Sequence, residues 1–487
     1  MFNQLLSKLK TSKPSFKLSL NEMPINTQDL AFRLNPRQFR LPTFSVSAFL
    51  QTVNSRLSNL PSISIRVPRP RLAQTIKTYA LKARKVITKK SIMGSLVGSL
   101  AMFYAYEYNP FNTNIRLSYQ NNQFNENLVQ SLSYLYGTHF YPSPLGVTSL
   151  LQAIFNKIPA AADVRFNREH LPLPDGGQIT LDWTLPTKPI EYAGSPLYGE
   201  HYPYQAPNNT KIMFIIHGLT GGSETHYIQQ LVDCARRKGY RPVVMNQRGV
   251  NQALTTPMPF HGGYLHDLEY AIAHVKKKYP DAPLVAVGTS FGGNQLMRYM
   301  GSEAGKKTFE AGVLLSAPFD LDDCVDAIQG SVYEEFFIRS YFDKNFLPNV
   351  DIFSTLAETH GINLEEIMRV KSLRDYHSLF TVKLYEHKDV REYFLHSKIF
   401  DHHIKNVNSP MLVLHAKDDP IACHKSIPVE SLRSNPNIIY AETSHGGHLG
   451  WFSGVNPQRV NTFYLFSFSN ICFSGTVNPL LSSWTKL

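Results

Sequence analysis

The part of this sequence best suited to chemistry is a glycine–serine–glycine turn. The pentapeptide Gly288-Thr-Ser-Phe-Gly292 follows the apolar run Pro283–Val287 and precedes a helix-like stretch, Asn294–Met300. A nucleophile elbow has this strand–turn–helix order, because its serine backbone is strained and side chains at the glycine positions would clash. Such a turn lifts the serine hydroxyl above the carboxyl edge of a sheet. Ser290 is therefore a candidate nucleophile, and the alternative is an ordinary glycine-rich turn.

A serine hydroxyl becomes a useful nucleophile only when a histidine removes its proton and a carboxylate holds that histidine in the right tautomer. In a doubly covered parallel sheet these partners follow the serine in the order acid, then histidine, each after a late strand. The sequence offers two candidates for each role, at the ends of two later apolar runs: Asp418 and Asp419, then His445 and His448. The order and the positions predict a Ser–His–Asp triad built on Ser290.

Local sequence favours one member of each pair. Asp419 directly precedes Pro420-Ile421, which suits the loop that usually carries the acid. His448 follows Gly446-Gly447, a pair that can bend the chain toward the nucleophile. We therefore predict Asp419 as the orienting acid and His448 as the base, with the neighbouring aspartate and histidine as the alternatives.

Acyl transfer also needs hydrogen-bond donors for the developing oxyanion. The backbone amide of Phe291, directly after the nucleophile, is one expected donor. The glycine-rich loop His217–Ser223 supplies the other, with Leu219 the preferred residue. No Gly-Lys-Ser/Thr follows this loop and no Gly-x-Gly-x-x-Gly opens the fold, so the sequence does not indicate nucleotide binding. The four cysteines are scattered without a CxxC pair, and we expect neither a metal nor an organic cofactor.

The elements around these residues alternate between strand and helix. A hairpin over 171–183 with an Asp-Gly-Gly turn comes first, followed by expected strands at 211–216, 242–245, 284–287, 312–316, 411–415 and 438–442. Expected helices lie at 227–238, 264–278 and 294–304. This pattern predicts an α/β fold: a mostly parallel, doubly covered sheet with an antiparallel N-terminal hairpin. Aromatic-rich helical sequence over about 319–408 reads as an insertion between the sixth and seventh predicted strands.

Taken together, the motifs resemble the lipid-active branch of the α/β-hydrolase superfamily, which includes membrane-anchored phospholipases, monoacylglycerol lipases, fatty-ester acyltransferases and bacterial esterases. The resemblance covers about residues 134–454 and rests on His217–Ser223, Asn246–Gly249, His261–Leu268, Gly288–Gly293, Asp418–Pro420 and His445–Gly450. It implies Ser290 as nucleophile, His448 as base and Asp419 as acid. Two segments depart from the family pattern, Val250-Asn251 and 147–153, so substrate specificity does not transfer with the motifs.

The resemblance also gives roles to residues around the triad. It implies that the insertion forms a cap over an acyl pocket, and that Arg248 and Asp267 pair below the site. Seven aromatic residues of the insertion are the expected apolar lining of this cap, or alternatively hold it to the core: Phe336, Phe337, Tyr341, Phe342, Phe346, Tyr385 and Tyr393.

The charge of the chain is concentrated at its N-terminus. The full sequence of 487 residues has a net charge of +12, but residues 1–90 alone hold 17 Lys and Arg against two acids, so the remainder is nearly neutral. An uncharged run, 91–106, follows a basic cluster and is close to the length of about 17 residues needed for the shortest membrane spans. We predict a basic arm (1–90), a membrane anchor helix (91–108) and a hydrolase domain (109–487). An organelle transit peptide is the alternative for the arm.

These observations predict a membrane-associated, single-pass serine hydrolase that cleaves carboxylic esters of lipids through an acyl-enzyme. Two alternatives remain: an acyltransferase that uses the same triad to form fatty esters, and a non-catalytic membrane-associated binding protein. No nucleic-acid recognition module accompanies the basic arm, so nucleic acid is not an expected partner. The sequence does not indicate an oligomeric state.

Overall fold

The computed structural model describes residues 115–131, 140–143, 148–149, 151–152, 164–184, 206–356, 359–453 and 458–459. The predicted basic arm (1–90) and anchor helix (91–108) lie outside these residues. Within the described part of the chain, no helix combines the length and the apolarity needed to cross a membrane.

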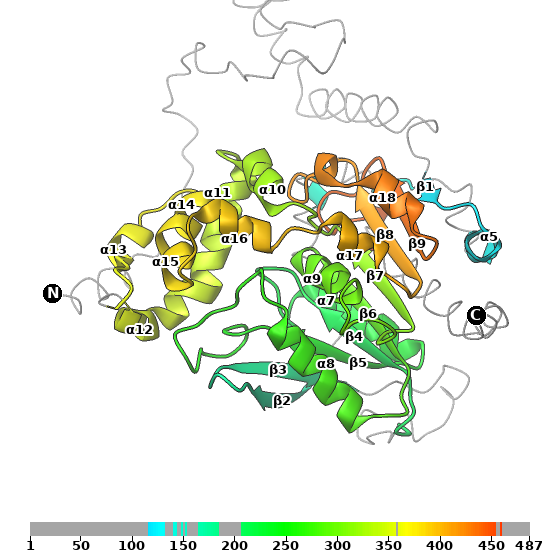
Figure 1. Cartoon of the computed structure of the whole chain (residues 1–487), viewed down its shortest axis with the longest axis horizontal. Coiled ribbons are helices and arrows are strands. Elements are labelled where there is room, and N and C mark those ends of the chain that lie inside the picture. The colour runs from blue at the N-terminus through cyan, green and yellow to red at the C-terminus, as the bar shows by residue number, and fades with distance from the viewer. Residues whose placement is uncertain are drawn as a thin grey trace, which may run out of the picture. The chain divides into compact units, whose positions relative to one another are not determined.

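Nine strands form one sheet in the described residues, in the order β1-β9-β8-β7-β6-β4-β5-β3-β2 (Figure 1). Their bounds are β1 Arg116–Tyr119, β2 Asn167–Pro172, β3 Gln178–Trp183, β4 Ile212–Ile216, β5 Arg241–Asn246, β6 Leu284–Thr289, β7 Ala311–Leu315, β8 Met411–Ala416 and β9 Ile438–Thr443. A short pair, β10 Phe452–Ser453 and β11 Gln458–Arg459, lies apart from this sheet.

The pairing within the sheet is mostly parallel. Strands β5, β4, β6, β7, β8 and β9 run parallel to one another, whereas β2 pairs antiparallel with β3, and β3 with β5. The predicted α/β fold, its N-terminal hairpin and its parallel sheet are therefore confirmed. The sequence did not predict β1, which pairs antiparallel with β9 at the far edge.

Helices cover both faces of the sheet. Successive residues of each strand point to opposite sides, so the apolar strands present side chains for burial on both faces. Ile212, Phe214 and Ile216 of β4 join a core cluster with the helices on one face, whereas Met213 and Ile215 join a second cluster on the other. The first face is covered by α8 His266–Lys278, α9 Phe291–Met300, α17 Asp401–Lys405 and α18 Val429–Ser434, and the second by α5 Gln123–Ser131 and α7 His226–Arg237.

Short helices between β7 and β8 form the predicted cap, drawn in yellow and yellow-green in Figure 1. They are α10 Leu321–Ile328, α11 Val332–Tyr341, α12 Val350–Phe353, α13 Leu364–Ile367, α14 Leu373–Tyr376, α15 Val382–Leu384 and α16 Val390–His396, joined in part by π-helical turns at Phe342–Phe346 and His377–Thr381. The first of these helices, α10, begins at Leu321, within the predicted insertion (about 319–408). The last helix of the predicted insertion, α17, belongs to the core instead, since Ile404 packs in the same core cluster as α8 and α9.

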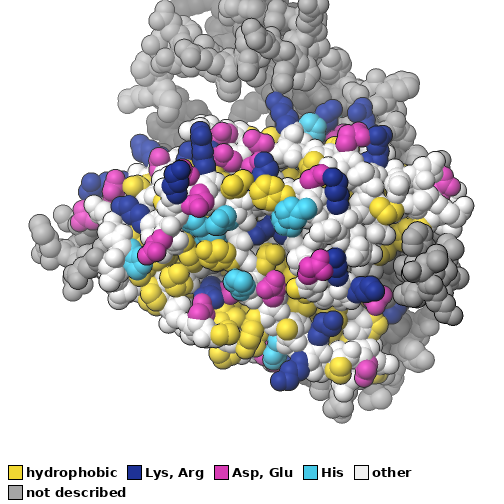
Figure 2. Space-filling view, in the orientation of Figure 1, with side chains coloured by type: hydrophobic (Ala, Val, Ile, Leu, Met, Phe, Trp, Pro, Cys, Tyr) yellow, Lys and Arg dark blue, Asp and Glu magenta, His cyan; other side chains and the backbone are white. Residues whose placement is uncertain are grey.

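The cap has an aromatic interior of its own. Tyr341, Phe346, Phe353, Tyr376 and Phe380 are buried together, and several of their rings meet edge to face. Of the seven aromatic residues predicted to line the cap, Phe336 differs, because its side chain is 45% exposed. The face shown in Figure 2 carries interspersed basic and acidic side chains, in keeping with the nearly neutral charge of the sequence after residue 90.

Candidate active site

Ser290 occupies a strained turn between β6 and α9. Its backbone φ is 51° and its ψ is −123°, a conformation that non-glycine residues rarely adopt and that clusters at functional sites. The turn is closely packed: a Cβ at Gly292 would lie 2.3 Å from the carbonyl oxygen of Ile216, and a Cβ at Gly288 would lie 2.5 Å from that of Gly292. These contacts explain why the pentapeptide has glycine at both ends, as the elbow prediction requires.

His448 lies between Ser290 and Asp419. Its Nε2 is 2.8 Å from Oγ of Ser290, and its Nδ1 is 2.9 and 3.1 Å from the two carboxylate oxygens of Asp419. An ionised carboxylate can only accept hydrogen bonds, so Nδ1 carries the proton and the lone pair of Nε2 faces the serine hydroxyl. In this tautomer the imidazole is able to accept the serine proton. The structure thus brings the three predicted residues together in the geometry of a Ser–His–Asp triad.

The carboxylate of Asp419 is ionised although it is buried. Burial alone would raise its pKa, but attraction to His448, the hydrogen bond from that ring and a backbone hydrogen bond from Ala422 together hold the pKa below its ordinary value. The amides of Ile421 and Ala422 donate to Oδ1 at 2.9 Å each. The backbone amides after Pro420 therefore hold the Asp419 carboxylate in place and help to keep it ionised where it faces the histidine.

The other aspartate and histidine of the two candidate pairs lie next to each other instead. Oδ2 of Asp418 is 3.9 Å from Nδ1 of His445, and its Oδ1 accepts the amide of Gly447 at 2.8 Å. Burial, with added repulsion from Asp419, raises the pKa of Asp418 to about 7. Neither Asp418 nor His445 has a hydrogen bond to Ser290 among the described contacts. Asp418 instead holds the glycine that precedes His448.

The loop expected to stabilise an oxyanion lies against the nucleophile. A Cβ at Gly218 would lie 2.9 Å from Cβ of Ser290, so the backbone of this loop contacts the serine directly. His217 anchors the start of the loop, since its Nδ1 donates to the carbonyl of Gly218 at 2.7 Å and its Nε2 accepts the amide of Gln247 at 3.3 Å. Burial lowers the pKa of His217 to about 4, so the ring is neutral at pH 7. The predicted donors come directly after the two residues that touch: Leu219 follows Gly218, and Phe291 follows Ser290.

Polar side chains of strands β2, β3 and β5 anchor the other end of the same loop. The hydroxyl of Ser223 donates to Asp182, and the amide nitrogen of Ser223 donates to Oδ1 of Asn246 at 2.8 Å. Asp182 is fully buried and also receives two hydrogen bonds from Arg168, at 2.7 and 2.8 Å. Because its negative charge is paired and its oxygens are satisfied, this buried cluster can hold the loop in one position.

Arg248 and Asp267 pair as predicted. Nε and Nη2 of the arginine donate to the two carboxylate oxygens at 2.6 and 2.7 Å, and Nη1 reaches Asp175 in the β2–β3 turn at 2.6 Å. Such two-pronged contacts fix the relative positions of the segments that carry them. Arg248 thus ties the hairpin turn and the start of α8 to the loop after β5.

One set of described side chains has the spacing of a metal site. Ligand atoms of His387, Glu392 and His396 in the cap lie within 4.8 Å of one another. The amide of Gly263 donates to Nδ1 of His261, so Nε2 of His261 carries the hydrogen and donates to Nε2 of His387 at 2.8 Å. The proton on His387 is then on Nδ1, which faces Glu392 at 3.8 Å. Nε2 of His387 is thus already engaged by His261.

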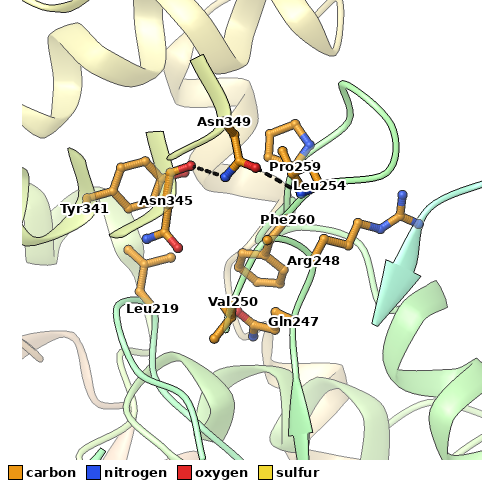
Figure 3. A pocket seen from close by; sticks show the side chains of 11 residues that line it. Leu219, Gln247, Arg248, Val250, Leu254, Pro259, Phe260, Tyr341, Asn345 and Asn349 are labelled. Atoms are coloured by element: carbon orange, nitrogen blue, oxygen red, sulfur yellow. Dashed lines mark hydrogen bonds between the residues drawn. The ribbon is translucent and has the colours of Figure 1, made fainter. Parts of the chain in front are cut away.

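Sequence reasoning found the triad residues but missed several of their supports. Ser316, at the end of β7, has a φ of 50°, and its Oγ accepts the amide of Leu449, next to His448, at 3.2 Å. A second residue that the sequence did not indicate, Asn345, lies in the cap and lines a small cavity that Leu219 also lines (Figure 3). Neither residue belongs to a recognisable motif, because its role depends on contacts between distant segments. The positive φ of Ser316 has no signal in the sequence.

The chain is similar to several curated proteins named as lipases and phospholipases. The chain is 27% identical over 323 residues to a Saccharomyces cerevisiae protein named monoacylglycerol lipase, covering 61% of this chain and 72% of the relative. It is 28% identical over 315 residues to the Mus musculus phospholipase ABHD3, covering 64% and 72%. It is 28% identical over 366 residues to the Danio rerio monoacylglycerol lipase ABHD2, covering 70% and 78%.

The family model that matches the chain is described as the alpha/beta hydrolase fold and covers residues 211–455. This range runs from the strand before the loop 217–223 to beyond His448, and it includes the cap. The resemblance inferred from the motifs is confirmed: this chain is a member of the α/β-hydrolase fold family.

Proposed function

We propose that the protein is a serine hydrolase that cleaves carboxylic esters of lipids through an acyl-enzyme on Ser290. The observation that carries the proposal is the position of His448, whose two ring nitrogens face the serine hydroxyl and the Asp419 carboxylate at 2.8 and 2.9 Å. The names of its relatives, monoacylglycerol lipases and a phospholipase, support esters of lipids as the substrate class.

The first half of the reaction transfers the acyl group to the enzyme. Oγ of Ser290 attacks the ester carbonyl carbon while Nε2 of His448 takes the hydroxyl proton, and the carbonyl oxygen becomes an oxyanion. The backbone amides of Leu219 and Phe291 donate hydrogen bonds to it. The tetrahedral intermediate then collapses: the bond to the alcohol oxygen breaks, His448 returns the proton to that oxygen, and the alcohol leaves.

The second half releases the acid. A water molecule attacks the acyl-enzyme as His448 accepts its proton, and the bond to Oγ breaks with return of the proton to Ser290. Asp419 keeps its charge throughout and stabilises the imidazolium that forms twice in the cycle. The lowered pKa of Asp419 supports this role, because a carboxylate that stays ionised can balance the positive ring.

Labelling with a fluorophosphonate probe tests the proposal, because the probe reacts covalently with an activated serine. Wild-type protein should be labelled and should hydrolyse p-nitrophenyl butyrate, and Ser290→Ala should lose both while it remains folded. Ser302→Ala, at a half-buried serine just beyond α9, is the matched control and should keep both. Labelling that persists in Ser290→Ala would overturn the assignment of the nucleophile.

Membrane association is a second part of the proposal and rests on the sequence alone. The basic arm and the uncharged run 91–106 support attachment to an anionic membrane surface through a single span. A lipid ester embedded in a bilayer would then reach an enzyme held at the same interface.

A further inference from the structure

Two cysteines meet where the cap joins the loop that carries Asp419. Cys324 belongs to α10, the first helix of the cap, and Cys423 lies four residues after Asp419. They are 99 residues apart in the chain, yet the backbone amide of Cys423 donates to Sγ of Cys324 at 3.2 Å. Both are free thiols in the described structure. The proposed reaction does not use this contact, and none of the motifs identified in the sequence includes either cysteine.

The pair is within reach of a disulfide bond. The nitrogen and Cα of one residue are about 1.46 Å apart, so Cα of Cys423 lies within about 5 Å of Sγ of Cys324. The two Cα atoms of a disulfide are roughly 4.4 to 6.8 Å apart, and the sulfurs lie between them. Because the side chain of Cys423 can rotate between staggered positions, its sulfur can approach that of Cys324 with only a small movement of the backbone.

The two thiols differ in their access to solvent. Cys324 is 4% exposed, whereas Cys423 is half-buried. Burial raises the pKa of Cys324, the hydrogen bond from the Cys423 amide opposes this rise, and the charge of Asp419 adds to it. Cys324 is therefore a protonated thiol at pH 7. A small oxidant in solution meets Cys423 first, and Cys324 is the thiol that can close the bond afterwards.

The loop 419–423 also holds the carboxylate of the triad. Three successive backbone amides of this loop have defined acceptors. Those of Ile421 and Ala422 donate to Oδ1 of Asp419 at 2.9 Å each, and the next, on Cys423, donates to Cys324. A change in the position of Cys423 is therefore passed directly to the amides that hold Asp419.

Helix α10 is in turn held in the cap. Val325 and Ile328 are buried in a cluster with other cap residues, and Arg374 of α14 donates to Asp322 at 2.6 Å. Cys324 precedes Val325 on the helix and contacts the loop 419–423 instead. A bond between the two sulfurs would thus link a helix of the cap covalently to the core loop that fixes the acid.

We propose that a peroxide oxidises Cys324 and Cys423 to a reversible disulfide, and that this bond lowers the turnover of the enzyme by displacing the loop 419–423. The bond holds the two sulfurs about 2.05 Å apart within a narrow range of dihedral angles, so the backbone of Cys423 has to adjust. A displacement of about 1 Å can lower a rate by as much as about 10²-fold. Formation of the bond does not depend on the proposed hydrolase function, whereas its effect on turnover rests on that function.

The oxidation takes two steps. The thiolate of Cys423 attacks hydrogen peroxide: an S–O bond forms, the O–O bond breaks, hydroxide leaves, and Cys423 becomes a sulfenic acid. Sγ of Cys324 then attacks this sulfur: the S–S bond forms, the S–O bond breaks, and the thiol proton leaves with the hydroxyl as water. In sum, two thiols lose two electrons and two protons, and one peroxide is reduced to two molecules of water.

Peroxide treatment of the full-length wild-type protein gives the first test. Peptide mapping without reductant should find the peptides of Cys324 and Cys423 linked, with the loss of two hydrogen atoms in mass. The kcat for p-nitrophenyl butyrate should fall about tenfold and should recover with dithiothreitol. Oxidised protein without linked peptides, or linked protein with unchanged kcat, would overturn the inference.

Substitutions locate the effect. Cys423→Ser keeps the backbone amide, so its kcat before oxidation should equal that of the wild type, and peroxide should leave it unchanged. Cys234→Ser, at a half-buried thiol on α7, is the matched control and should respond to peroxide as the wild type does. A reversible loss of kcat in Cys423→Ser as large as that in the wild type would contradict the assignment to this pair.

A third variant tests the order of the two steps. In Cys324→Ser the sulfenic acid on Cys423 has no thiol to react with, so dimedone, a reagent for sulfenic acids, should label Cys423 after peroxide treatment. Labelling should be much weaker in the wild type, where the disulfide removes the sulfenic acid. This measurement needs no catalytic activity, and it decides the inference even if Cys423→Ser fails to fold. Equal labelling of the two proteins would disprove that Cys324 closes the bond.

The outcomes separate this inference from the proposed function. Reduced wild type that reacts with the fluorophosphonate and hydrolyses the ester, but forms no linked peptides with peroxide, disproves the disulfide alone. Reduced wild type that neither reacts with the probe nor hydrolyses the ester disproves the proposed function, and with it the effect of the bond on turnover.

Discussion

Asp418 and Asp419 are neighbours in the chain, yet their carboxyl groups face different histidines. Asp419 lies 2.9 Å from Nδ1 of His448, whereas Asp418 lies 3.9 Å from Nδ1 of His445 and accepts the amide of Gly447. Their pKa values shift in opposite directions, since the charge of Asp419 is stabilised by His448 and that of Asp418 is destabilised by burial and by Asp419. Two similar residues thus have separable roles that substitution can measure.

Asp419→Asn should lower turnover by roughly 10³- to 10⁴-fold while the protein stays folded. An amide in place of the carboxylate favours the wrong tautomer of His448 and does not stabilise the imidazolium. Asp418→Asn should cost far less, because its side-chain oxygen still accepts the amide of Gly447. Steady-state hydrolysis of p-nitrophenyl butyrate measures both. A larger loss for Asp418→Asn than for Asp419→Asn would show that the acid has been misassigned.

The raised pKa of Asp418 predicts how stability depends on pH. Its folded-state pKa of about 7 lies above the ordinary value of 3.8, so between pH 4 and 7 the folded state holds this proton more often than the unfolded state. Stability therefore falls as pH rises through this window, by at most about 1.4 kcal/mol per pH unit from this one group. Asp418→Asn removes the effect.

Urea unfolding of wild type and Asp418→Asn at several pH values between 4.5 and 7.5 measures this pH dependence of stability. As pH rises, the free energy of unfolding of the wild type should fall relative to that of Asp418→Asn. A difference that stays constant across the window would contradict the raised pKa. The comparison reduces the contributions of other groups, including Asp419, whose lowered pKa contributes stability that is lost only as pH falls below about 4.

The close packing at the elbow predicts that Gly292→Ala is severely disruptive. Its Cβ would lie 2.3 Å from the carbonyl oxygen of Ile216 in the neighbouring strand, and backbone cannot give way as a flexible side chain does. We expect a loss of at least about 3 kcal/mol in the free energy of unfolding, with loss of fluorophosphonate labelling.

Gly239→Ala provides the contrast for this prediction. The glycine has a φ of 82° but no atom within 4 Å of an added Cβ, so only backbone strain of about 1 to 2 kcal/mol is expected, with labelling retained. Equal destabilisation by the two substitutions would show that contact with Ile216 does not set the requirement for glycine at the elbow.

The sequence predicted the triad because its members follow strands whose order is fixed by the fold. Strong apolar runs made β4, β6 and β8 recognisable, with boundaries displaced by only one or two residues. The choice of Asp419 over Asp418 depended on the proline that follows it, a local signal of turn geometry. These elements are local in the chain, and local patterns describe them well.

What the sequence missed depends on contacts between distant segments. Strand β1 has only four residues, too few for an alternation of polar and apolar residues to be recognised. Its partner β9 lies more than 300 residues later in the chain. The helix predicted at 294–304 instead begins at Phe291, because the elbow leads directly into α9, and it ends at Met300.

The last prediction concerns residues 1–108, which lie outside the described structure. Full-length protein should sediment with membranes, and protein lacking residues 1–108 should remain in the soluble fraction. Hydrolysis of p-nitrophenyl butyrate should be largely unchanged by the deletion, because the substrate is soluble and the triad lies in the hydrolase domain. Activity on esters embedded in vesicles should fall much more, since their delivery depends on a protein held at the interface.

Salt distinguishes the two modes of attachment. An anionic leaflet contributes about 1 kcal/mol for each basic residue near its surface, and salt screens this attraction. If residues 91–106 insert, 1 M NaCl should leave the full-length protein in the membrane pellet, and only detergent should extract it. Extraction by salt alone would mean that the basic arm binds the surface without a span. Full-length protein that stays soluble at low salt would contradict both modes and favour a transit peptide, because removal of the arm after import leaves no basic segment to bind lipid.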